Sequence, residues 1–136
     1  FDCLSPHLLG RIKERKFQSG HDYYVIPLLS DHHYVLFVLH PKLGAVFYVD
    51  SLHSYFEEAQ VDEWLTQIER ASKFTITQWA DMFDKPVQEG DNTCGAYVAS
   101  AVKVVLTCDP HDWPRKTLEC VSEMKLLLDK KSSSLE

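Results

Sequence analysis

Four residues of this chain could together perform acyl-transfer chemistry through a cysteine thiol. They are His33, Asp50, Gln88 and Cys94. A thiol nucleophile needs an imidazole to take and return its proton, a group that orients the imidazole, and donors for the oxyanion of the tetrahedral intermediate. The chain offers one candidate for each task. Each residue alone has an ordinary structural interpretation, so the hypothesis depends on the joint pattern.

A β-hairpin is predicted to bring the histidine and the aspartate together. Two runs rich in β-branched and aromatic residues flank a turn sequence at 40–44. A two-residue or a four-residue loop places Leu39 opposite Val46. In that register His33 is the diagonal neighbour of Asp50 on one face of the hairpin, whereas a one-residue bulge would separate them. Both faces are apolar, so we expect a central hairpin in a sheet that is covered on both sides.

Other histidines compete for the role of base. His32, His40 and His53 lie close to the same segments. In the predicted register His32 points to the face opposite Asp50, so we predict that His33 is the base. A metal site built on Asp31, His32 and His33 is an alternative, but no further ligand cluster has suitable spacing.

Cys94 is predicted to begin a helix. Asn92 and Thr93 are favourable N-cap residues, and an apolar run follows over 94–107. The run is apolar on nearly every side, which is typical of a buried helix. A helix N-terminus favours negative charge and therefore favours a thiolate. Gly95 leaves room for a substrate backbone beside the sulfur.

Two hydrogen-bond donors near Cys94 could stabilise an oxyanion. Gln88 precedes Cys94 by six residues in a polar loop that contains glycine. Its side-chain amide could donate to the oxyanion, as could the main-chain N–H of Cys94.

In these features the chain resembles the ubiquitin-like protein-specific protease family, the SUMO proteases of the adenain-like clan CE of cysteine proteases. The resemblance covers about residues 23–106. It is carried by a strand at 24–28, His33 beside an aromatic residue, Asp50-Ser51-Leu52 after the next strand, and Gln88 six residues before Cys94-Gly95.

The resemblance implies a role for each of these residues. His33 would be the general base and later the acid, and Asp50 would orient it. Cys94 would be the nucleophile, and Gln88 would help to form the oxyanion hole. The family members cleave after the Gly-Gly C-terminus of a ubiquitin-like modifier, SUMO or ubiquitin, through a thioester and without a cofactor.

The chain departs from the family at two positions beside these residues. The family usually has Trp after the catalytic His and Asp before the nucleophile, whereas this chain has Tyr34 and Thr93. Tyr34 would line the channel for the residues before the scissile bond. Because Tyr is smaller than Trp, we expect this channel to accept a bulkier residue. The alternative is that Tyr34 packs on the opposite sheet face.

Length and composition bound the other possibilities. The 136 residues fit one catalytic domain, 1–136, and a hydrophobic content of 45% is enough for a core. Phe1 indicates a trimmed or processed start, so we expect a missing N-terminal region, and 132–136 could be an added tail. The formal net charge of −6 disfavours nonspecific binding to nucleic acid or membranes. No apolar run is long enough to span a bilayer.

The cysteines predict the compartment. They lie at 3, 94, 108 and 120, with neither CxxC pairs nor zinc spacing. A chain with this core needs no disulfide framework. We therefore expect a reducing intracellular compartment, the nucleus or cytoplasm, or a host cell if the source is a pathogen.

The expected elements follow the order α-β-β-β-α-β-α-α, which indicates an α+β fold with helices against a mixed sheet, of the adenain-like kind. The residues expected to face inward in the last helix are Leu118, Val121, Met124, Leu127 and Leu128. The ranges are a helix at 3–15, a strand at 22–29, the hairpin at 33–51, helices at 57–71, 94–107 and 115–130, and a strand at 74–79.

Three other functions share parts of this pattern. A polyprotein-processing protease of the adenovirus type would use the same residues. Acetyltransferases of the clan reuse the catalytic order, but they need acetyl-CoA and a basic site for an anionic activator, which this acidic chain does not obviously have. A binding module that kept the fold and lost activity is the non-enzymatic alternative.

Overall fold

The computed structural model describes residues 2–14, 23–88 and 93–135. Its order is the predicted one, and the α+β class is confirmed. The elements are α1 (Pro6–Glu14), β1 (Tyr24–Ser30), β2 (His33–His40), β3 (Ala45–Val49), α2 (Glu58–Ser72), β4 (Gln78–Asp81), α3 (Cys94–Thr107) and α4 (Trp113–Leu135), with 3-10 turns at Pro41–Leu43 and Pro110–Asp112.

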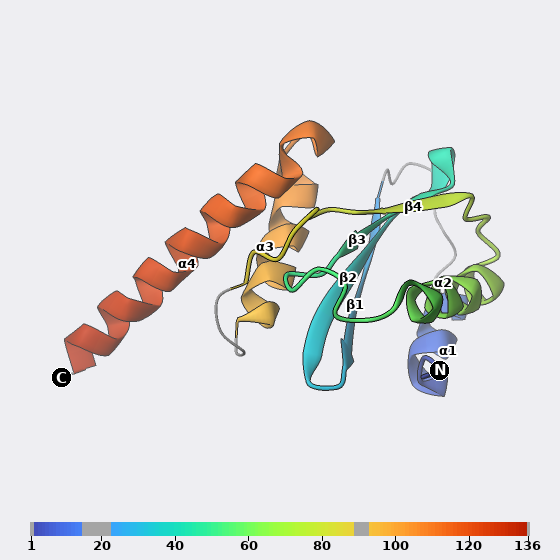
Figure 1. The fold of residues 1–136 in the computed structure, drawn as a ribbon, viewed down its shortest axis with the longest axis horizontal. Helices are drawn as coiled ribbons and strands as arrows, with labels where there is room; N and C mark the ends of the chain where they lie inside the picture. The colour runs from blue at the N-terminus through green and yellow to red at the C-terminus, as the bar shows by residue number, and fades with distance from the viewer. Residues whose placement is uncertain (1, 15–22, 89–92, 136) are drawn as a thin grey trace.

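Four strands form one sheet between two layers of helices (Figure 1). The strand order is β1-β2-β3-β4, with antiparallel pairs up to β3 and a parallel pair between β3 and β4. Helices α1 and α2 cover one face, and α3 and α4 cover the other. Successive β2 residues alternate between these cores: Val35 and Phe37 pack towards α2, and Leu36 and Val38 pack towards α3. The predicted two-sided cover of the hairpin is confirmed.

The loop between β2 and β3 sets the register. It is four residues long, with a 3-10 turn over Pro41–Leu43 that ends at Gly44. Gly44 has a φ of 62°, in the left-handed region that glycine enters without steric cost. Leu39 pairs with Val46, which is the predicted register.

The strand expected at 74–79 is shifted towards the C-terminus. Helix α2 ends at Ser72, and the residue that caps it, Lys73, has a φ of 60°. The main-chain N–H of Ile76 then donates to the Glu69 carboxylate at 2.6 Å, and Thr77 donates to the Gly44 carbonyl at 2.7 Å. These bonds tie 74–77 to α2 and to the hairpin loop, so regular pairing with β3 begins only at Gln78.

Helix α3 begins and ends where expected but is not buried all round. Leu106 is 74% exposed, and Lys103 is also exposed. The reason is that α3 packs on the sheet with one side and on α4 with another, which leaves a third side to solvent.

Helix α4 begins at Trp113 and is longer than expected. Val121 is buried and Met124 is half-buried. The inward placement of Leu118 and Leu127 is wrong, because they are 37% and 62% exposed. The C-terminal part of α4 extends past the rest of the molecule (Figure 1). The side chain of Leu128 lies outside the described residues. No helix in the described ranges is both long enough and apolar enough to cross a membrane.

Candidate active site

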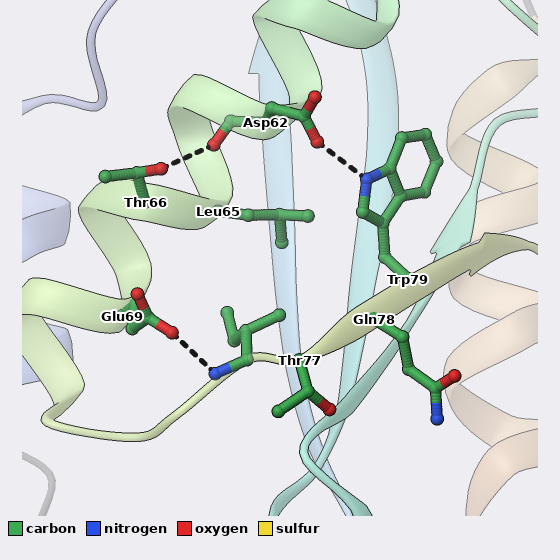
Figure 2. Close-up of a pocket in the computed structure, with 8 residues that line it drawn as sticks. Asp62, Leu65, Thr66, Glu69, Thr77, Gln78 and Trp79 are labelled. Carbon is green, nitrogen blue, oxygen red and sulfur yellow. Dashed lines mark hydrogen bonds between the residues drawn. The ribbon is translucent and has the colours of Figure 1, made fainter.

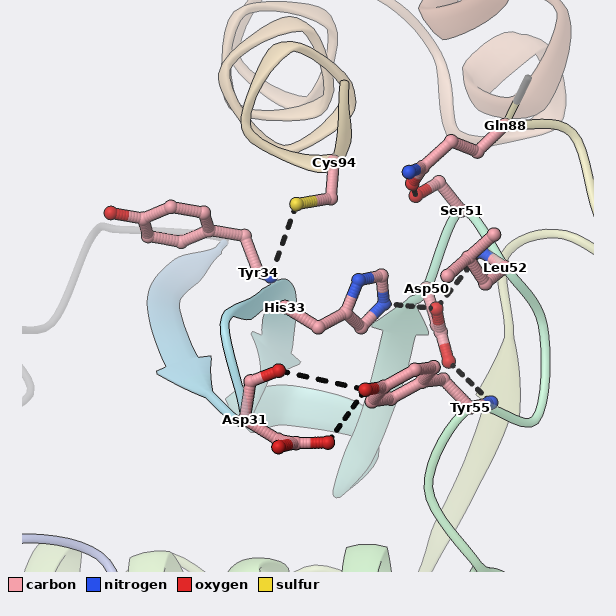
Figure 3. Close-up of polar contacts among 9 residues, drawn as sticks. All are labelled: Asp31, His33, Tyr34, Asp50, Ser51, Leu52, Tyr55, Gln88 and Cys94. Atoms are coloured by element: carbon pink, nitrogen blue, oxygen red, sulfur yellow. Dashed lines mark hydrogen bonds and ion pairs between the residues drawn. The ribbon is translucent and has the colours of Figure 1, made fainter. Parts of the chain in front are cut away.

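His33 and Asp50 form a buried hydrogen-bonded pair at one end of the sheet. Asp31 and His32 make a two-residue turn with φ values of 51° and 58°, and His33 is the first residue of β2. Its Nε2 lies 2.7 Å from Asp50 Oδ1 (Figure 3). The two residues are 4% and 2% exposed. The diagonal contact expected from the hairpin register is present.

This bond determines which imidazole nitrogen can act on a thiol. An ionised carboxylate can only accept, so the hydrogen in the bond to Asp50 must belong to Nε2. The neutral ring of His33 then has an unprotonated Nδ1. Figure 3 shows the ring between Asp50 and Cys94, with Nδ1 on the side where Cys94 lies. The arrangement can therefore accept a proton from the cysteine side and stabilise the resulting imidazolium through Asp50.

The Asp50 carboxylate has two further donors, which hold it in place. The main-chain N–H of Leu52 donates to Oδ1 at 3.0 Å, and that of Tyr55 donates to Oδ2 at 3.0 Å. Asp50 therefore also stabilises the turn that follows it, as an aspartate in an Asp-Ser pair ordinarily does. The turn presents the carboxylate to His33 in a fixed orientation.

Cys94 is the first residue of α3, and its sulfur lies beside the start of β2. The main-chain N–H of Tyr34 donates to Cys94 Sγ at 3.4 Å. Thr93 occupies the N-cap position, as expected, but its side chain makes no capping hydrogen bond. Asn92 lies outside the described residues. The N-terminus of α3 and the Tyr34 N–H both favour negative charge on the sulfur.

Tyr34 lies beside Cys94 because strand alternation places it on the α3 side of the sheet. It is 41% exposed. A Cβ added to Gly95 would lie 3.7 Å from Tyr34 Cδ2, so the ring passes next to the glycine. Tyr34 therefore lies on the sheet face opposite His33 and also borders the nucleophile. Its position is compatible both with packing on that face and with lining the substrate channel.

Gln88 is held by Ser51, through a contact that the sequence pattern does not predict. The Ser51 hydroxyl donates to Gln88 Oε1. The Ser51 carbonyl accepts from the main-chain N–H groups of Val87 and Gln88 at 2.9 and 3.0 Å. Figure 3 shows the Gln88 amide on the side of the site where Cys94 lies. The Asp50-Ser51 pair was visible in the sequence, but its contact with Gln88 crosses 37 residues.

Tyr55 is a second site residue that sequence reasoning missed. Its ring lies against the His33 imidazole, with ring centres 4.4 Å apart. Its hydroxyl donates to Asp31 Oδ2 at 2.6 Å, in the turn before His33. The only sequence signal was an aromatic pair, Tyr55 and Phe56, a few residues after Asp50.

The competing histidines have other positions. His32 is exposed in the turn before β2. His40 Nδ1 accepts from the Leu43 N–H at 3.3 Å and caps the 3-10 turn. His53 lies in the turn after Asp50, with a φ of 45°. Across the described ranges, no three His, Cys, Asp or Glu side chains are grouped as a metal site would require.

Two ionisable groups next to Asp50 resist taking up negative charge. Burial, and then the charges of Asp50 and Asp81, raise the pKa of Tyr48. Burial also raises the pKa of Asp81; His53 opposes this shift, and Asp50 and Glu58 add to it. Tyr48 and Asp81 are paired across β3 and β4.

A cavity of about 290 Å³ lies elsewhere, between α2 and β4 (Figure 2). Trp79 borders it and donates through Nε1 to Asp62 at 2.8 Å. Trp79 packs partly against the α2 core, and this cavity shares no residue with the His33 site. Trp64 and Trp113 are core residues.

Comparison with solved structures shows the fold. One match is "SUMO protease Ulp1 with the catalytic cysteine oxidized to a sulfinic acid": the TM-score is 0.53 and the identity 22%, over 82% of this chain and 56% of that one. A second, of Ulp1 with the catalytic cysteine oxidised to a sulfenic acid, has a TM-score of 0.49 and 23% identity over 74% and 51%. This chain thus spans about half the length of those proteins. No protein-family model and no curated protein sequence matches it. The chain has a Ulp1-like fold.

Proposed function

We propose that this chain is a cysteine endopeptidase or isopeptidase that cleaves after the Gly-Gly C-terminus of a ubiquitin-like modifier. The observation that carries the proposal is the buried bond of 2.7 Å between His33 and Asp50, with the Cys94 sulfur held on the other side of the imidazole. The Ulp1-like fold supports it, since Ulp1 is a SUMO protease with a catalytic cysteine.

The first half of the reaction forms a thioester. His33 Nδ1 takes the Cys94 proton, and the thiolate attacks the carbonyl carbon of the last glycine. The negative charge moves to the carbonyl oxygen, where the main-chain N–H of Cys94 and the amide of Gln88 stabilise it. The N–H groups of the first two residues of α3, Cys94 and Gly95, have no acceptor in an α-helix and are suited to this task. Collapse of the intermediate expels the amine, which His33 protonates.

The second half of the reaction restores the enzyme. Water attacks the thioester carbonyl while His33 Nδ1 takes a proton from it, and the same donors stabilise the second oxyanion. The carbon–sulfur bond then breaks. The Cys94 thiolate leaves and takes the proton back from His33, and the acid that is formed releases its proton to solvent as the modifier departs with a free carboxylate. Asp50 remains ionised throughout and stabilises the imidazolium each time it forms.

The ring of Tyr34 supports the choice of a glycine-terminated substrate. It is exposed beside Gly95 and the sulfur. A flat aromatic wall next to the nucleophile leaves little room for a β-carbon on the residues that precede the scissile bond. We propose that Tyr34 and Gly95 bind this tail.

Labelling with electrophilic probes tests the proposal. Ubiquitin, SUMO and other modifiers, each with a C-terminal propargylamide, are incubated with the protein, and the adduct is detected by intact mass. We expect one modifier class to add once, at Cys94. The Cys94→Ala variant should form no adduct, keep its circular dichroism spectrum and show no turnover.

A matched cysteine variant controls for accidental reactivity. Cys3 is exposed, whereas Cys94 is buried, so a nonspecific electrophile would prefer Cys3. Labelling should persist in Cys3→Ala. Labelling or turnover that survives Cys94→Ala would contradict the proposal. Acetyl transfer from acetyl-CoA, with no labelling by any modifier probe, would favour the acetyltransferase alternative instead.

A further inference from the structure

Ser51 joins the end of β3 to the segment that carries Gln88. It is 2% exposed and directly follows Asp50. Its carbonyl accepts from the N–H groups of Val87 and Gln88 at 2.9 and 3.0 Å, and its hydroxyl donates to Gln88 Oε1. Three hydrogen bonds from one buried residue therefore hold the main chain of Val87 and Gln88 and the side chain of Gln88.

The orientation of the Gln88 amide decides whether it can help a reaction. Only the NH₂ end donates a hydrogen bond, and a carbonyl oxygen in its place would repel a developing negative charge. The terminal torsion of a glutamine side chain has a broad and nearly two-fold energy profile, so the side chain itself does not select one end. A neighbouring group must make the choice.

The Ser51 hydroxyl is placed to make that choice. When it donates to Oε1, the oxygen end of the amide is held at Ser51 and the nitrogen is the opposite end. Figure 3 shows this amide on the side of the site where Cys94 lies. The hydroxyl could also accept from a flipped amide, but that amide would present its oxygen to the oxyanion. The transition state therefore favours the donating arrangement. A donor on Oε1 also polarises the amide and strengthens its N–H groups as donors.

We propose that Ser51 is a positioning residue that fixes the Gln88 amide with its nitrogen towards the oxyanion. The inference rests on the proposed function and adds a task to it. Asp50 orients the base, and its neighbour Ser51 orients the oxyanion donor, so two adjacent residues at the end of one strand serve both halves of the site. A rigid strand end suits this purpose because both partners must keep their geometry.

A double-mutant cycle measures this coupling. Turnover of a fluorogenic peptide ending in Gly-Gly is followed for the wild type, Ser51→Ala, Gln88→Ala and the double variant. Gln88→Ala should lower kcat by about 10²–10³-fold, as loss of an oxyanion donor does. Ser51→Ala should lower kcat by about tenfold or more, with KM nearly unchanged, but should have almost no further effect in the Gln88→Ala background.

Two variants act as controls in the same assay. Ser51→Thr keeps the hydroxyl and should retain most of the kcat. The Ser100 hydroxyl is as buried as that of Ser51, but it contacts Met124 of α4. Ser100→Ala should therefore leave kcat unchanged. Equal fold-losses from Ser51→Ala in the presence and absence of Gln88 would overturn the inference.

A second measurement does not depend on activity. The Gln88 side-chain NH₂ signals in a ¹⁵N correlation spectrum are assigned by their loss in Gln88→Ala. In Ser51→Ala they should move towards the shifts of a free glutamine, while in Ser100→Ala they should stay in place. Unmoved signals in Ser51→Ala would overturn the positioning role. A wild type without turnover would contradict the proposed function, and the Gln88 signals would still decide the role of Ser51.

Discussion

The phenol ring of Tyr55 covers one side of the His33 imidazole, with the ring centres 4.4 Å apart. The same residue donates its main-chain N–H to Asp50 Oδ2 at 3.0 Å. Its hydroxyl reaches Asp31 in the turn before His33. One surface residue thus contacts the base, the carboxylate that orients it, and the turn that begins its strand.

Removing the Tyr55 ring should slow turnover, whereas removing its hydroxyl should matter less. Tyr55→Ala leaves the bond to Asp50 intact but exposes the imidazole to water. An aromatic contact of this kind contributes about 0.5–1.5 kcal/mol, which corresponds to a loss in kcat of up to about tenfold. Tyr55→Phe keeps the ring and should stay near the wild-type rate. Steady-state kinetics on both variants makes the comparison, and equal losses would assign the effect to the bond with Asp31.

The two neighbouring histidines should differ sharply in importance. His33→Ala should abolish turnover, because no other described histidine bonds to Asp50. For His32 the appropriate change is Asn, which tolerates the φ of 58° at that turn position. His32→Asn should keep a near-normal kcat/KM. An active His33→Ala beside an inactive His32→Asn would show that the base is misassigned.

Asp50→Asn should cost less than Cys94→Ala. The imidazole can still accept a proton when it is poorly held, whereas no other group replaces the sulfur. An asparagine has one acceptor oxygen, so it cannot satisfy the donors on both carboxylate oxygens. Comparison of kcat/KM for the two variants checks the order. Asp109→Asn, near the opposite end of α3 and about 20 Å along that helix, is a matched control and should have no effect.

Tyr34 should determine which residues are accepted just before the scissile bond. A series of peptides that varies the two terminal glycines is compared for the wild type, Tyr34→Ala and Tyr34→Trp. The Ala variant should tolerate larger residues, and the Trp variant should be stricter. Each variant keeps the main-chain N–H that donates to Cys94, so a change in preference reports the side chain alone. An unchanged preference in Tyr34→Ala would make Tyr34 a packing residue.

Tyr48→Phe should stabilise the fold. Within the described residues the buried Tyr48 hydroxyl has no hydrogen-bond partner. Its removal relieves a desolvation penalty, and we expect the free energy of unfolding to rise by about 1 kcal/mol. Tyr97→Phe is the matched control. It should lower the free energy of unfolding, because the Tyr97 hydroxyl donates to the Val87 carbonyl at 2.8 Å. Urea unfolding at pH 7 measures both, and a destabilised Tyr48→Phe would contradict the expectation.

The stability gain from Tyr48→Phe should widen in alkali. Burial raises the pKa of Tyr48, so the folded chain keeps the phenol proton while the unfolded chain releases it above pH 10. The wild type therefore loses stability as pH rises, by up to about 1.4 kcal/mol per pH unit from this group. The Phe variant lacks that loss. Unfolding curves at pH 7 and pH 10.5 compare the two proteins.

The sequence alone was sufficient for the order of the elements and for the contact between His33 and Asp50. Both depend on local rules. The alternation of side chains along a strand and the length of the loop at 41–44 determine which residues share a face of the hairpin. The start of α3 at Cys94 follows from the apolar run after a polar loop.

Only the tertiary structure decided how these elements meet. The Tyr34 N–H reaches the Cys94 sulfur across 60 residues, and Ser51 reaches Gln88 across 37. The short β4 and the exposed leucines of α4 were also beyond the sequence patterns, since each depends on which layer lies opposite. Periodicity states which side chains share a face, but the position of one element on another is determined by packing between residues distant in the chain.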